Sequence, residues 1–186
     1  MQKTNNDLKQ HGRTSSAAIE NISHPASSRG ESLAARIEEG AARLATFAAR
    51  ISDTEWQTPI SATDRRTVGV IVHHVASMYP IEVDLARAVA GGKSVSEVTW
   101  QAVAQLNAKH AHDSAHVSKA AALELLRQNS REAAAAVRDF RDEELDKAAP
   151  FSLSFDAPMT AQFVIEDHAM RHSWQHLAAI RKALGR

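Results

Sequence analysis

Between residues 31 and 184, apolar residues recur every three or four positions, in segments separated by proline, glycine and short polar clusters. This period is typical of amphipathic helices, which bury one face and expose the other. The sequence therefore predicts an all-α fold, a four-helix bundle with a short extra helix. The predicted helical segments span residues 31–52, 67–90, 95–110, 118–140 and 160–184.

The segment 67–90 carries its own boundary signals. Thr67 suits the N-cap, because its hydroxyl can accept a free backbone N–H of the first turn, and Gly91 ends the pattern. Pro80 lies inside this segment. Because proline lacks an amide donor and clashes with the preceding turn, we expect a kink or short break around Ser77 to Pro80.

Two stretches lack the helical period. Residues 1–30 are rich in serine, asparagine, lysine and glutamine, and offer too little apolar surface to offset the entropy of ordering the chain. We expect a flexible tail over residues 1–30 and one helical-bundle domain over residues 31–186. The segment 142–158, before the last helix, is predicted to be irregular.

Composition limits the partners and the sites that the chain can have. The 22 Lys and Arg residues balance 22 Asp and Glu residues without a long run of like charge, so we expect no nucleic-acid partner. No apolar run approaches the ~20 residues of a membrane span, and we expect a cytoplasmic protein that does not bind membranes. Because the sequence has no cysteine, histidine and carboxylate are the available strong metal ligands.

Three histidines lie four residues apart in the stretch HAMRHSWQH, namely His168, His172 and His176. Two histidines one turn apart on a helix can reach one ion, whereas His168 and His176 are separated by ~12 Å along the axis. His74 falls at a core-facing position of the segment 67–90 and can be the third ligand. His172 and His176 share a predicted buried stripe with Ile165, Ala169, Ile180 and Ala183.

Two alternatives stay open at this point. The inward histidines could be ordinary core side chains with satisfied rings, because HxxxH occurs often by chance in a chain with 10 histidines. The ligand pair could also be His168 and His172, one turn earlier than His172 and His176.

The other histidines are expected to lie near solvent. His73 is about 100° around the helix from His74, and should face a neighbouring helix or solvent. A further cluster lies at a predicted helix end and in a polar connector, where a solvated surface is the expected environment. Its members are His110, His112, Asp113 and His116.

Two motifs resemble a known family. The stretch RRTVGVIVHHVASMYPIEVDLARAV resembles the second-helix signature of the DinB/YfiT-like family of four-helix-bundle metalloproteins. HSWQHLAAIRKAL is similar to the C-terminal HxxxH motif of that family, and the resemblance covers about residues 31–186. It places the metal ligands of the family on His74, His172 and His176.

The resemblance implies a putative metal-dependent enzyme, a hydrolase or thiol transferase, with a divalent ion such as Zn²⁺ or Ni²⁺. Three imidazoles leave the ion an open position for hydrolysis or for transfer of a low-molecular-weight thiol to a small electrophilic substrate. We expect a small-molecule substrate, His168 as a candidate catalytic residue, and a homodimer. The alternative function is a noncatalytic metal-binding or stress-related helical bundle.

Overall fold

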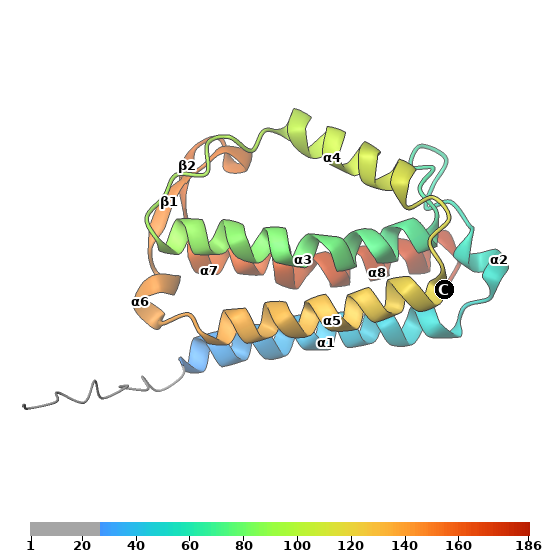
Figure 1. Cartoon of the computed structure of the whole chain (residues 1–186), viewed down its shortest axis with the longest axis horizontal. Coiled ribbons are helices and arrows are strands. Elements are labelled where there is room, and N and C mark those ends of the chain that lie inside the picture. The colour runs from blue at the N-terminus through green and yellow to red at the C-terminus, as the bar shows by residue number, and fades with distance from the viewer. Residues whose placement is uncertain (1–26) are drawn as a thin grey trace, which may run out of the picture.

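The computed structural model describes residues 27–186 and shows a four-helix bundle (Figure 1). Helix α5 packs against both α1 and α3, and α8 packs against the same two helices. The predicted fold class is therefore confirmed, while residues 1–26 of the predicted tail lie outside the described residues. The bundle helices are α1 (Ser28–Arg50), α3 (Val68–Ala90), α5 (Lys119–Arg138) and α8 (Arg171–Ala183).

Helices α1, α3 and α5 begin at polar caps, and all four bundle helices bury apolar residues in the core. The side chain of Ser27 accepts from the first turn of α1, which begins three residues before the predicted start, and Thr67 and Ser118 cap α3 and α5 in the same way. Their inward residues form one core, with Ile37, Leu44, Ile71, Val75, Leu126 and Ile180 among the fully buried side chains. Within residues 27–186, no helix is both long and apolar enough to cross a membrane.

The predicted break at Pro80 is not observed, since α3 runs as one helix from Val68 to Ala90. Proline removes the amide that would donate to the carbonyl four residues earlier, which is that of Ala76. The Asn129 side chain of α5 donates to this carbonyl instead, at 2.8 Å. A neighbouring helix thus satisfies the acceptor that Pro80 leaves free, and the helix continues.

The segment predicted to be irregular contains regular structure. Residues 142–160 form the short helix α6 (Asp142–Leu145), the strand β1 (Ala148–Phe151), a 3₁₀ turn and the strand β2 (Ala157–Thr160). The two strands pair antiparallel, and Phe155 and Asp156, both with φ of 59°, make the turn between them. Four-residue strands containing prolines carry too little alternation to be recognised in the sequence.

The same hairpin explains why the third predicted helix begins late. Val95 donates its N–H to Pro150 and accepts from the N–H of Ser152, both at 2.9 Å, so its backbone is not free to start a helix. Helix α4 (Trp100–Asp113) therefore begins five residues after the predicted start, and it ends three residues after the predicted end. A further short helix, α2 (Asp53–Trp56), follows α1.

The last predicted helix is divided by a wide turn. It begins as α7 (Ala161–Val164), capped by Thr160, continues as the π-helical turn η2 (Ile165–Met170) and then becomes α8. A π turn has i→i+5 hydrogen bonds and is frequent at functional sites. Its six residues lie directly before the histidine pair of α8.

Candidate metal centre

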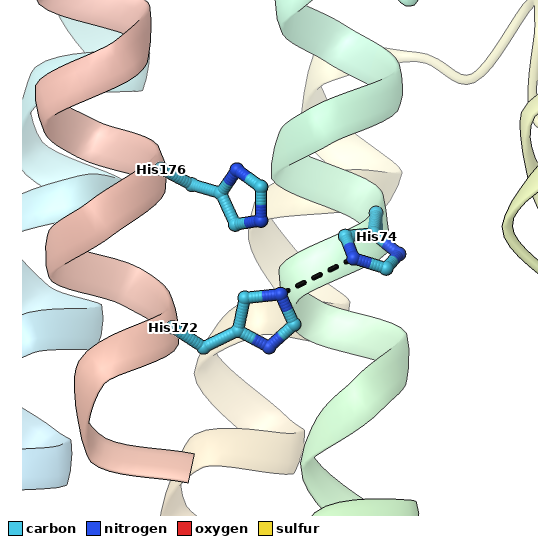
Figure 2. A group of neighbouring side chains, drawn as sticks. All are labelled: His74, His172 and His176. Atoms are coloured by element: carbon cyan, nitrogen blue, oxygen red, sulfur yellow. Dashed lines mark hydrogen bonds between the residues drawn. The ribbon is translucent and has the colours of Figure 1, made fainter. Parts of the chain in front are cut away.

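Three histidines from two helices converge between α3 and α8 (Figure 2). His74 comes from α3, and His172 and His176 come from successive turns of α8. One ring nitrogen of each lies within 4.8 Å of those of the other two, and Nε2 of His74 is 3.2 Å from Nε2 of His172. The ring centroids are 4.8 to 5.5 Å apart. The structure therefore brings together the three histidines that the sequence predicted.

Burial keeps the rings of His74 and His176 neutral. His74 is only 5% exposed, and burial lowers its pKa to about 2, with smaller contributions from the neighbouring histidines. Burial likewise lowers the pKa of His176 to about 3, assisted by His172 and Arg66. Neutral imidazole is the form that binds a metal ion, so both rings are in the ligand state at neutral pH.

Glu82 of α3 fixes the orientation of His172. Its Oε1 accepts a hydrogen bond from Nδ1 of His172 at 2.5 Å, and the carboxylate is only 4% exposed. With the proton on Nδ1, the Nε2 lone pair of His172 is directed to the other two rings. Such a carboxylate behind a histidine is the usual arrangement at metal sites, because it selects the tautomer and raises the basicity of the ligand.

A buried hydrogen bond ties the two helices together beside the site. The hydroxyl of Tyr79 in α3 lies 2.6 Å from the hydroxyl of Ser173 in α8, and both residues are fully buried. Ser173 is next to His172 in the sequence, and Tyr79 lies between His74 and Glu82. The separation between the histidines of the two helices is thus set by core contacts.

The histidine group opens on a cavity of about 370 Å³. Helix α4, on the side of α3 away from α5 (Figure 1), supplies the opposite wall with Trp100, Val103, Leu106 and Asn107. His74, expected at a core-facing position, lines this cavity together with Met78, Ile81 and Leu85 of the same helix, and Ile81 is 40% exposed. The polar lining includes Arg66, whose guanidinium pairs with Asp64 at 2.7 Å.

His168 lies in the cavity wall but outside the histidine group. Its ring is largely buried, packs 5.5 Å from that of Phe151, and has a pKa lowered by this burial. Within residues 27–186, the convergent group contains His176 and omits His168. The geometry thus favours the pair His172 and His176 over the alternative pair one turn earlier.

The connector histidines do not all lie on a solvated surface. His112 and His116 are exposed, as expected, but His110 is half-buried in the last turns of α4. Its Nε2 is 2.9 Å from Nδ1 of His73, which faces α4. The prediction for His110 was wrong because its burial comes from the contact with His73 of α3, and a contact between distant segments leaves no signal in the sequence.

Sequence reasoning missed Glu82 and Arg66. Glu82 lies eight residues after His74, which is about 80° around α3, so helical periodicity did not place it beside that histidine. Arg66 precedes the helix and carries no periodic signal. Its position depends on the loop between α2 and α3, where Asp64 holds its side chain.

Comparisons with known proteins agree with the fold. The family model described as the DinB superfamily matches residues 36–180. A solved structure described as "YfiT from Bacillus subtilis is a probable metal-dependent hydrolase with an unusual four-helix bundle topology" is similar, with a TM-score of 0.68 and 18% sequence identity. The similarity covers 88% of this chain and 90% of that chain. A comparison with curated proteins gives no match.

Proposed function

The chain belongs to the DinB superfamily, and from this premise we propose that it is a metal-dependent enzyme that hydrolyses a small electrophilic substrate. His74, His172 and His176 would hold one divalent ion, with Zn²⁺ and Ni²⁺ the best matches to an all-nitrogen ligand set. The description of the similar YfiT structure as a probable metal-dependent hydrolase supports this reaction class.

The donor set fits a catalytic ion. Three neutral imidazoles fill three of the four positions of tetrahedral zinc, and catalytic zinc sites keep the fourth position for water or substrate. When bound, such an ion lowers the pKa of a water molecule or a thiol and so supplies a nucleophile at neutral pH. The observation that carries the proposal is that the histidine group borders a cavity instead of being closed by the core.

The residues around the histidines would have separate roles. Glu82 would hold the ring of His172, while its Oε2, buried and without a hydrogen-bond partner among residues 27–186, is an available acceptor for a proton. Arg66 would add a positive charge at the cavity and attract a polarised or anionic group of the substrate. His168 in the cavity wall is the candidate for a substrate contact.

Transfer of a low-molecular-weight thiol is the second candidate reaction. It is favoured by Asn107 and Gln175, whose amide side chains line the cavity and could bind the polar groups of an organic thiol. Water as the nucleophile would not need such contacts. The apolar wall of α4 would then receive the electrophilic substrate.

Cobalt substitution tests the proposal without knowledge of the substrate. Metal-stripped protein loaded with one equivalent of Co²⁺ should change its visible absorption spectrum when azide is added, because azide occupies an open coordination position. His176→Ala should abolish the Co²⁺ spectrum, whereas His112→Ala, a change at an exposed histidine, should preserve it. If azide does not change the absorption spectrum of the Co²⁺-loaded protein, the result would favour the noncatalytic metal-binding alternative.

Two assays on the zinc-loaded protein then distinguish hydrolysis from thiol transfer. Metal-dependent release of 4-nitrophenol from 4-nitrophenyl acetate would indicate hydrolysis. Metal-dependent coupling of glutathione to 1-chloro-2,4-dinitrobenzene, without ester hydrolysis, would indicate thiol transfer.

A further inference from the structure

A second pair of histidines lies beside the first group, on the opposite flank of His74. We propose that His73 and His110 form a second site for a divalent transition metal ion, bridging α3 and α4. The ligand atoms would be Nδ1 of His73 and Nε2 of His110, which lie 2.9 Å apart. This inference does not depend on the proposed catalytic function.

The geometry of the pair is close to that of the first group. Two nitrogens bound to one tetrahedral zinc ion at ~2.1 Å lie roughly 3.4 Å apart, so a small outward rotation of the rings would admit an ion. The ring centroids of His73 and His110 are 5.0 Å apart, within the range found for the rings of His74, His172 and His176. The two sites adjoin, since the ring of His110 also meets that of His74 edge-on at 5.4 Å.

The surroundings of the pair suit an ion. Both rings are half-buried between α3 and α4, where few water molecules can compete for an ion. Hydroxyls of Ser77 and Ser114 lie 3.5 and 3.4 Å from the two ligand nitrogens and can bind water molecules of a partly hydrated ion. His110 Nδ1 is buried and has no hydrogen-bond partner among residues 27–186.

An ion at this site would fasten α4 to the bundle. Within the described part of the chain, α4 has no buried residue, so its hold on α3 is weak. The contact between His73 and His110 joins the two helices near the C-terminal end of α4. A bound ion would replace one hydrogen bond by two coordinate bonds and would hold the cavity wall in place.

Zinc titration of the metal-stripped, tag-free protein tests the site by calorimetry. Wild-type protein should bind two equivalents of Zn²⁺, the second more weakly because the protein supplies two ligands in place of three. His110→Ala should bind one equivalent. The matched control His112→Ala, an exposed histidine of the same helix, should bind two.

Hydrogen exchange on the wild-type protein gives a second measurement that needs no variant. The second equivalent of Zn²⁺ should slow amide exchange in α4, whereas the first equivalent should leave that helix unchanged. Binding of a single equivalent by wild-type protein, or two equivalents by His110→Ala, would overturn the proposal and identify the pair as a hydrogen bond only. Two equivalents without slower exchange in α4 would place the second ion elsewhere and would equally overturn it.

Discussion

The two walls of the cavity are built differently. On one side, α3 and α8 carry the histidines and are fixed by the core, with Glu82 and the Tyr79–Ser173 hydrogen bond behind them. On the other side, α4 has no buried residue within residues 27–186, and its Trp100 is 60% exposed. The wall formed by α3 and α8 is held rigidly by core packing and hydrogen bonds. The wall formed by α4 is held mainly at the two ends of that helix.

This difference separates two tasks. A metal site needs ligands held to within a fraction of an ångström, which requires packed helices and hydrogen-bonded ligands. A wall that receives a small molecule can be less rigid, and mobile covers over reaction sites commonly have few buried contacts. Changes on the α3–α8 side should therefore affect stability or the metal affinity of the group formed by His74, His172 and His176, and changes at apolar side chains of α4 should affect neither.

The largest effect is expected from His176→Ala. It removes one of three proposed coordinate bonds, so the affinity for Zn²⁺ should fall by more than the ~10–100-fold typical of losing a partner behind a ligand. His168→Ala should leave the affinity unchanged, because that ring lies outside the convergent group. Metal titration of both variants checks this, and a loss confined to His168→Ala would assign the site to the earlier pair.

Glu82→Gln should have the next largest effect. An amide is a weaker and uncharged acceptor for the Nδ1 proton of His172, so the affinity for Zn²⁺ should fall about 10- to 100-fold. The control is Asp84→Asn, which removes an exposed carboxylate of the same helix. Equal affinities for the two variants would show that the buried carboxylate does not support the ligand.

Asn129→Ala tests whether the hydrogen bond from α5 to the carbonyl of Ala76 stabilises α3. The carbonyl of Ala76 would lose its donor and could not regain one from Pro80, so the free energy of unfolding should fall by about 1–3 kcal/mol. Gln128→Ala, one position along α5 and exposed, is the matched control. Urea denaturation of both variants measures the difference, which should vanish if the acceptor is satisfied in another way.

The smallest effect on stability is expected from Leu106→Ala on α4. Leu106 is 42% exposed, so the free energy of unfolding should change by no more than about 0.5 kcal/mol. Zinc affinity should also be unchanged. A loss of 2 kcal/mol or more, measured by urea denaturation, would show that α4 is packed as tightly as the opposite wall.

The sequence predicted the bundle from helical periodicity, and it predicted the three histidines from periodicity together with the family resemblance. His74 and the pair in α8 lie on faces that a period of 3.6 residues identifies, and burial of Ile165, Ala169 and Ile180 confirms that stripe. Features that depend on contacts between distant segments could not be predicted. Asn129 compensates for Pro80 across two helices, and the pairing of Val95 with the β1–β2 hairpin delays α4.

The site was only partly predictable for the same reason. Glu82 lies about 80° around α3 from His74, so periodicity does not distinguish it among the 22 acidic residues, and only its burial beside His172 does. The environment of His110 depends on the packing of α4 against His73 of α3, which helical periodicity does not predict.

The π turn before α8 changes the rotational register between α7 and α8. Core contacts of Leu177 and Ile180 fix α8, and those of Ala161 and Val164 fix α7. One residue corresponds to about 100° of helix rotation, so a deletion within residues 165–170 could be absorbed by returning the turn to an ordinary α-helix. Such a change would turn His168 relative to the cavity while leaving His172 and His176 in place. Homologous chains could therefore vary the substrate end of the cavity by gaining or losing one residue here, at no cost to the histidine group.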